Sequence, residues 1–379
     1  MKKLKIISLI LVMLSLTSCM PQNTEIKYRL IISGIGVDYD QETNQYELTV
    51  QVLEASKGSE GQGQSETPVS NYTVKADTIA QAITSLGENT GKYPLYSQNR
   101  MIILGNSVTG EQMIKAMNFF VREYTSRPDV FIAASTGKAS DVLTIDGSEE
   151  VPAKLIESSI EQSYENSVSV NTELYDTVNL SLEETSCFTI PLIEVVEDRN
   201  KKEKTIKVTG TRACSKDSEP KMLSDTETMA FQFAMNEIQA GTLSINCDNT
   251  AVGLEIISSK TKTKLIIKDG KPVFNLEIKC EADVVEYESG VFRNLTESDV
   301  EKIQLQAQQH IESSVNGLLD RMLKKEHCDI FRFGKRLEQK YPEIYKELSK
   351  DWKNSLTGIQ VNVTAKVNIG RIGQMTIEE

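Results

Sequence analysis

Two short stretches carry residue types that could support chemistry. Gly34-Ile35-Gly36 begins with the spacing of a dinucleotide-binding loop, and Asp38, Asp40 and Glu42 alternate like the first ligands of a calcium loop. The first stretch lacks a third glycine and leads into a hairpin rather than a helix, so we interpret it as a strand-end bend. The second has no glycine at its sixth position and lies in a hairpin turn, which favours a solvated turn.

The chain offers little else for catalysis. Gly105-Asn106-Ser107 lacks the context of a nucleophile elbow, and neither a Walker loop nor an HExxH zinc motif occurs. Only two histidines are present, so a serine triad would need His310 or His327. His310 falls within a predicted long helix, where a packed or solvated side chain is expected. We therefore predict a protein that is not an enzyme, with no catalytic residues and no cofactor.

The cysteines do not form a recognisable pattern. Apart from Cys19 they are spread widely, at Cys187, Cys214, Cys247, Cys280 and Cys328. None forms a CxxC or CxxH pair, so no metal site is predicted. An odd set of scattered cysteines favours small buried side chains over a disulfide framework. The sequence leaves open whether any two of them pair.

The first residues have the features of an export signal. Lys2, Lys3 and Lys5 precede an apolar run from Ile6 to Leu16, which is too short to span a bilayer. We therefore predict a signal peptide over residues 1–18. A plain secretory signal is the alternative, in which case the cysteine at position 19 stands there by chance.

The end of this leader, Leu16-Thr17-Ser18-Cys19, resembles the lipobox of bacterial lipoproteins. The resemblance implies cleavage just before Cys19 and transfer of a diacylglyceryl group to its thiol. Each buried acyl CH₂ contributes about 0.8 kcal/mol, so two or three acyl chains would hold the protein on a membrane. Residues 19–27 would then form a lipid-anchored tether.

The remaining chain has the composition of a folded, extramembrane protein. Of its 379 residues 39% are hydrophobic and 25% are charged, and the mean hydropathy is −0.30. No second apolar stretch approaches bilayer length, so we expect everything after Cys19 to lie outside the membrane. The net charge of −12, without a basic stripe, argues against nucleic-acid binding. It also argues against lying flat on anionic lipid, so the anchor must hold the protein there.

An N-terminal α/β-type domain is predicted over residues 28–200. Alternating and β-branched residues indicate strands, while apolar residues at helical spacing indicate helices. The alternation of the two favours a sheet with helices on one face. The predicted elements are a β-hairpin at 28–53, strands at 100–105 and 130–135, and helices that begin at Asp77 and Thr109.

The end of this domain is predicted at the charged turn over residues 198–204. The strand before it, at 188–196, contains Pro191. Because proline has no N–H to donate to a neighbouring strand, this residue places the strand at a sheet edge.

A C-terminal α+β domain is predicted over residues 205–379, with a possible subdivision near residue 248. A β-meander with a tight turn at Asp269-Gly270 is followed by a long helix from 296 to about 326 and a returning strand at 359–370. The whole chain is therefore α+β and multi-domain, with mixed or antiparallel sheets and packed helices. The meander strands are predicted at 252–258, 263–267 and 273–285.

The C-terminal residues then carry a resemblance to a known family. The stretch Cys328-Asp329-Ile330-Phe331-Arg332-Phe333-Gly334, followed by Tyr341-Pro342, Asp351-Trp352 and a closing strand that ends in Gly370, resembles the Ger(x)C family. Arg332 stands where that family has its first glycine. The N-terminal half agrees in order and spacing, at residues Gly34–Asp40, Gln98–Gly105, Arg122–Pro128, Ala139–Leu143 and Val208–Ala213.

The resemblance implies a lipid-anchored C-subunit of a spore nutrient germinant receptor, at the outer face of the spore inner membrane. It implies assembly with polytopic A- and B-type membrane subunits, and binding of the nutrient by another subunit than this one. The chain would then support germination without catalysis. A solute-binding lipoprotein of a transport system is the alternative. That function predicts a ligand cleft between two similar lobes, whereas the two halves of this chain differ in their pattern of predicted helices and strands.

Five residues of the C-terminal segment are candidates for a structural role: Asp329, Phe331, Phe333, Gly334 and Trp352. Phe331 and Phe333 alternate with polar residues and can pin the segment onto the helix before it. Asp329 suits the N-cap of the helix that Gly334 enters, and this glycine suits a backbone angle closed to other residues. Trp352 is expected in the core. Contact with a partner protein is the alternative role for this segment.

Overall fold

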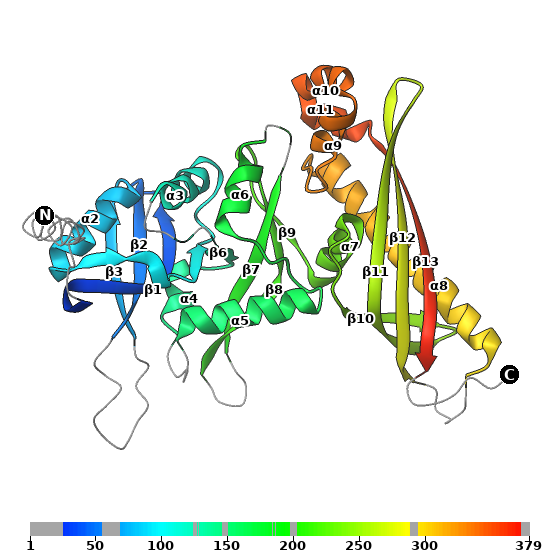
Figure 1. The fold of residues 1–379 in the computed structure, drawn as a ribbon, viewed down its shortest axis with the longest axis horizontal. Helices are drawn as coiled ribbons and strands as arrows, with labels where there is room; N and C mark the ends of the chain where they lie inside the picture. Colours follow the sequence, from blue (N-terminus) through cyan, green and yellow to red (C-terminus); the bar gives the residue numbers. More distant parts are fainter. Residues whose placement is uncertain are drawn as a thin grey trace, which may run out of the picture.

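The computed structural model describes residues 26–54, 69–123, 127, 129–145, 151–183, 185, 187–197, 203–288 and 295–372. The predicted signal peptide, Cys19 and most of the predicted tether lie outside these residues. The described chain is elongated and holds two β-sheets, one after the other along its long axis (Figure 1). The first strand, β1 (Arg29–Asp40), lies toward one end of this axis, and the last, β13 (Gln360–Ile372), lies toward the other.

The first sheet is mixed. Besides β1, its described strands are β2 (Gln45–Leu53), β3 (Val69–Ala76), β4 (Tyr93–Leu95), β5 (Met101–Leu104), β6 (Phe131–Ser135), β7 (Phe188–Glu197), β8 (Lys204–Cys214) and β9 (Lys221–Leu223). Their order is β3-β2-β1-β5-β6-β7-β8-β9, with β4 beside β1. The four strands β1, β5, β6 and β7 run parallel, while antiparallel hairpins extend the sheet on both sides.

Helices cover both faces of this sheet, so the prediction of helices on one face was wrong. The side chains of β5 show why, because Ile102 and Leu104 enter one core while Met101 and Ile103 enter the other. A strand buried on both faces reads as a continuous apolar run rather than an alternating one. The first core holds α2 (Ile79–Thr90), α3 (Gly110–Arg122) and α6 (Leu174–Ser181); the second holds α4 (Ala139–Leu143) and α5 (Pro152–Glu165).

The glycine pair near the N-terminus lies within β1 and not at a strand-end bend. A Cβ atom at Gly34 would stand 2.9 Å from Cβ of Ala153, and one at Gly36 would stand 3.1 Å from Cβ of Ala139. The two glycines therefore let α5 and α4 approach the strand closely. Asp38 is also buried rather than solvated, since its carboxylate accepts the N–H groups of Ala139 (2.9 Å) and Ser140 at the start of α4.

Strand β7 is an interior strand, which corrects the edge position predicted from Pro191. It pairs with β6 on one side and with β8 on the other. Pro191 is tolerated because pairing with β6 begins only at the next residue and the register with β8 shifts just after it. Because β7 and β8 are neighbours in one sheet, the predicted boundary at residues 200–205 falls between two paired strands.

The second sheet has the order β10-β11-β12-β13. Its antiparallel strands are β10 (Gly241–Cys247), β11 (Thr250–Lys268) and β12 (Lys271–Tyr287), and β13 returns parallel to β12. The two strands predicted at 252–258 and 263–267 are one strand, and β10 was not predicted. The possible subdivision near residue 248 falls between the paired strands β10 and β11. The Asp269-Gly270 turn is confirmed, since both residues have positive φ angles, as a type I′ hairpin turn requires.

The core of the second sheet is covered by α7 (Asp225–Met235) and by the long α8 (Glu297–Leu319), which continues as a π-helix, η3 (Asp320–Lys325). Two side chains of α8 also cover the free edge of β13. Glu312 accepts the N–H of Ala365 at 2.7 Å, and Gln304 accepts the N–H of Ile369 at 3.1 Å. Such capping blocks pairing of the edge with another strand. The remaining short elements are η1 (Ile26–Tyr28), η2 (Tyr96–Gln98), α9 (Phe333–Lys340), α10 (Pro342–Leu348), η4 (Ser349–Asp351) and α11 (Trp352–Thr357).

Candidate functional site: the junction of the two sheets

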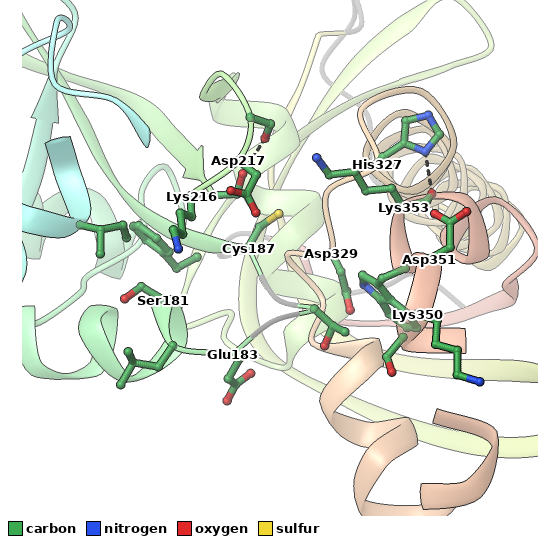
Figure 2. Close-up of a pocket in the computed structure, with 18 residues that line it drawn as sticks. Ser181, Glu183, Cys187, Lys216, Asp217, His327, Asp329, Lys350, Asp351 and Lys353 are labelled. Carbon is green, nitrogen blue, oxygen red and sulfur yellow. Dashed lines mark hydrogen bonds between the residues drawn. The ribbon is translucent and has the colours of Figure 1, made fainter. Parts of the chain in front are cut away.

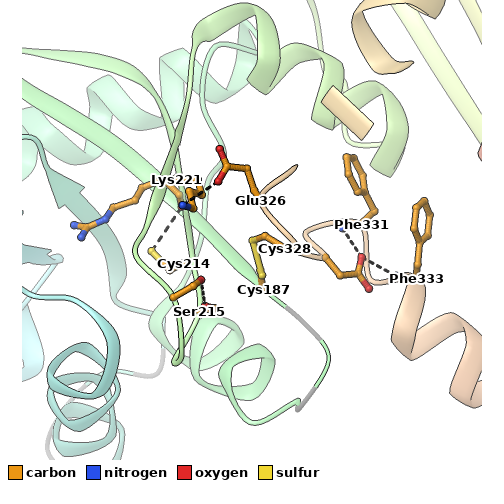
Figure 3. The surroundings of a disulfide bond; sticks show 11 residues. Cys187, Cys214, Ser215, Lys221, Glu326, Cys328, Phe331 and Phe333 are labelled. Carbon is orange, nitrogen blue, oxygen red and sulfur yellow. Dashed lines mark hydrogen bonds and ion pairs between the residues drawn. A yellow bond between two sulfur atoms is a disulfide. The ribbon is translucent and has the colours of Figure 1, made fainter. Parts of the chain in front are cut away.

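A disulfide joins the two sheets, between Cys187, directly before β7, and Cys328 after η3 (Figure 3). The two Cα atoms lie 5.8 Å apart, although the residues are separated by 141 positions in sequence. For this pair the prediction of unpaired, buried cysteines was wrong. Cys214, Cys247 and Cys280 are free thiols and buried, as predicted. Burial raises the pKa of the Cys214 thiol to about 11 and that of Cys280 to about 12.

Asp329, next to the disulfide, organises the loop that leads into α9. It is 1% exposed, and its carboxylate accepts the N–H groups of Phe331 (3.2 Å), Phe333 (3.1 Å) and Gly334 (2.8 Å). Its own carbonyl accepts the N–H of Cys187 at 3.1 Å, so the loop is bonded to the residue that precedes β7. Burial outweighs the three N–H donors and raises the pKa of Asp329 to about 6.

The N-cap role predicted for Asp329 is realised from a different position. The N-cap residue of α9 is Arg332, whose φ of 58° lies in the left-handed region and whose side chain makes no capping bond. Asp329 stands three residues before it, yet its carboxylate satisfies the N–H groups of the first two helical residues, Phe333 and Gly334.

The two phenylalanines of the loop join the second core. The rings of Phe331 and Phe333 stack with centroids 5.5 Å apart, and Phe333 stacks on Phe274 of β12 at 4.1 Å. Phe331 also lies 6.0 Å from the ring of Phe231 on α7. The loop is thereby packed between a helix and a strand of the second sheet.

Gly334 is required by space rather than by a backbone angle, which corrects the reason given from sequence. Its φ is not positive, and it lies within α9. A Cβ atom there would stand 2.8 Å from Cβ of Thr185 and 2.9 Å from Cζ2 of Trp352. The glycine therefore lets α9, the segment before β7 and α11 meet. Trp352 is buried against the same core.

A cavity of about 530 Å³ opens beside this contact (Figure 2). One wall comes from the first sheet and its loops, with Glu183, Lys216 and Asp217. The other comes from the C-terminal segment, with His327, Asp351 and Lys353. Charged side chains of both signs line it, together with apolar residues such as Leu182 and Phe188. Ion pairs between Lys335 and Glu183 and between Lys221 and Glu326 join the two walls nearby.

Among its described residues, the junction does not show a catalytic arrangement. Nδ1 of His327 lies 2.8 Å from the carbonyl oxygen of Lys353, so one ring nitrogen is engaged with the backbone and not with a serine or cysteine. Among the residues that the structure describes, no three His, Cys, Asp or Glu side chains gather as metal ligands. His310 lies apart from the junction, at a smaller cavity beside α7 and α8.

Comparison with known proteins gives two domain matches that together cover most of the chain. Residues 22–195 match the family described as spore germination protein N-terminal domain. Residues 216–373 match the family described as spore germination B3/GerAC-like, C-terminal. The chain belongs to the Ger(x)C family. The sequence resemblance is therefore confirmed.

Individual relatives of this Ger(x)C chain are similar over most of their length. Spore germination protein B3 of Bacillus subtilis is 25% identical over 355 residues, 90% of this chain and 91% of the relative. Spore germination protein A3 of the same organism is 26% identical over 278 residues, 72% of each chain. The crystal structure of the GerBC protein has the same fold, with a TM-score of 0.59, 20% identity, and coverage of 89% of this chain and 96% of the other. The predicted α+β class is confirmed by this match.

The burial of Arg212, on β8, was not predicted from the sequence. The side chain is 1% exposed, and its guanidinium donates to the carbonyl oxygens of Gly105 (3.5 Å) and Val108 (3.4 Å). In the described part of the chain no carboxylate forms an ion pair with it. The sequence gives no signal for this burial, because the carbonyls that receive the arginine lie more than a hundred residues away.

Proposed function

We propose that this chain is the lipid-anchored C-subunit of a spore nutrient germinant receptor, held at the outer face of the spore inner membrane through Cys19. The observation that carries the proposal is the pair of spore-germination domain matches, over residues 22–195 and 216–373. None of the helices in the described ranges is long and apolar enough to cross a membrane. We propose that the tether from Cys19 attaches the chain to the membrane.

In this proposal the subunit works with polytopic A- and B-type membrane subunits and carries out no catalysis. Another subunit binds the nutrient, and this chain supplies a scaffold or couples ligand binding to ion release. Anchoring confines the folded part near its partners, so the effective concentration of a weak interface rises without any new contact.

The junction is the proposed rigid element of this scaffold. The five residues singled out from the sequence are all buried there: Asp329, Phe331, Phe333, Gly334 and Trp352. Each one either contacts a segment from elsewhere in the chain or forms a hydrogen bond within the loop. The disulfide and the Cys187–Asp329 backbone bond connect this loop to β7. We propose that the five residues act by keeping the two sheets in a fixed relation.

A solute-binding function is less well supported. The two halves are unlike, since in the described residues one is a nine-stranded mixed sheet covered on both faces and the other is a four-stranded sheet with a long helix. A thermal-shift screen against amino acids and sugars separates the two functions, because a saturating ligand that binds only the folded state raises the melting temperature. A large, saturable shift would favour the solute-binding function.

The test of the proposed function is Cys19→Ala in the full-length chain. The variant removes the thiol that would carry the lipid, so we expect the protein to leave the membrane fraction and the nutrient response of the spores to be lost. The wild-type chain, expressed at the same level, is the control. Retention on the membrane together with a full response would overturn the proposal.

A further inference from the structure

Three apolar or aromatic side chains are exposed together where the described chain begins. Ile26 is 70% exposed, Tyr28 is 49% exposed and Tyr93 is 63% exposed. Tyr93 lies at the same end of the sheet, because β4 pairs in parallel with the start of β1 and places Tyr93 opposite Arg29, the residue that follows Tyr28. We call Ile26, Tyr28 and Tyr93 the end patch. Neighbouring exposed side chains of this size and chemistry commonly mark an interaction surface.

The position of the end patch limits what can reach it. It lies at the end of the long axis where β1 starts, far from the second sheet (Figure 1). The seven peptide bonds from Cys19 to Ile26 can span at most about 25 Å. A lipid on Cys19 would therefore hold this end of the molecule close to the membrane surface.

The chemistry of the end patch matches that surface. Tyrosine is enriched where a protein meets the headgroup region, because the ring is apolar and the hydroxyl stays hydrated. Arg29 and Lys92 adjoin Tyr93 and bring positive charge to this end of an otherwise acidic chain. Basic side chains near a membrane surface are attracted to anionic headgroups.

We propose that the end patch docks into the headgroup region of the bilayer, so that the molecule stands on its β1 end rather than swinging freely on its tether. This inference rests on the proposed anchor at Cys19. It adds an orientation to that proposal, since the second sheet would then project away from the lipid. It also limits membrane contact to a small area, as expected of a chain with a net charge of −12.

The experiment couples the mature chain, beginning at Cys19, to a maleimide lipid in phosphatidylglycerol–phosphatidylethanolamine vesicles. Coupling at Cys19 is selective, because Cys187 and Cys328 are paired and burial raises the pKa of the other thiols. Hydroxyl-radical footprinting then compares vesicle-bound with free protein. We expect oxidation of Ile26, Tyr28 and Tyr93 to fall several-fold, while Tyr175, which is 53% exposed on α6, keeps its rate.

A matched pair of variants separates docking from simple shielding by the tether. Tyr93→Ser removes the ring beside the start of β1 and is expected to return Tyr28 to its rate in free protein. Tyr175→Ser is expected to leave the protection of Tyr28 unchanged. Equal oxidation of the end patch in free and bound protein would overturn the proposal and leave the patch to a protein partner. Because the coupling is chemical, this result does not depend on whether cells acylate Cys19.

Discussion

Replacing both Cys187 and Cys328 with alanine is expected to lower the free energy of unfolding by about 5 kcal/mol. The residues are separated by 141 positions, and closing so long a loop removes much of the conformational entropy of the unfolded chain. Alanine is the appropriate replacement because both positions are buried and a serine hydroxyl would need a partner. The measurement is urea-induced unfolding of the wild-type and double-variant proteins without reductant.

Two controls identify the cross-link as the cause. Reductant should shift the urea midpoint of the wild-type protein toward that of the double variant, and it should leave the midpoint of the double variant unchanged. Cys280→Ala removes a buried thiol that has no disulfide partner, so we expect a loss of about 1 kcal/mol and a retained response to reductant. A wild-type midpoint that is indifferent to reductant would contradict the cross-link between the two sheets.

Asp329→Asn is expected to remove a pH dependence of stability. Burial raises the pKa of Asp329 from its ordinary 3.8 to about 6 in the folded protein. Between these pH values the folded state binds more protons than the unfolded state, so stability falls as pH rises. The contribution is present in full below about pH 4, and about 3 kcal/mol of it is lost by pH 7. Asparagine does not titrate, so the variant lacks this fall.

Urea unfolding at several pH values between 4 and 7 measures the effect. The stability of the wild type relative to the Asn variant should fall by about 2.5 kcal/mol between pH 4 and pH 7. Asp329→Ala should remove the same slope and destabilise further, because three buried N–H groups then lack their acceptor. A difference that stays constant with pH would show that the carboxyl is ionised throughout.

The elements that are long and strongly patterned could be predicted from the sequence. The helix α8, the Asp269-Gly270 turn and the returning strand β13 are local features, each specified by its own spacing of apolar residues or by its turn residues. The single strand β11 was divided because its central residues are polar, and its continuity depends on pairing with β12. The interior position of Pro191 likewise depends on a register shift that only the neighbouring strands create.

Only one of the two segments that form the candidate site could be predicted from the sequence. The loop from Cys328 to Gly334 has a recognisable pattern, and the structure places it at the junction. Its counterparts, Cys187 and Thr185, lie about 140 residues or more earlier in a segment with no motif. Odd cysteine numbers give no pairing rule, and a glycine selected for close contact looks the same in sequence as one selected for a positive φ.

The most direct test of the proposed role is the mass of the amino-terminal peptide from the native protein, purified from spore membranes. The proposal predicts a chain that begins at Cys19 and carries a diacylglyceryl group on its thiol. A peptide with an unmodified cysteine at this position, or a protein recovered in the soluble fraction, would contradict a membrane-held receptor subunit.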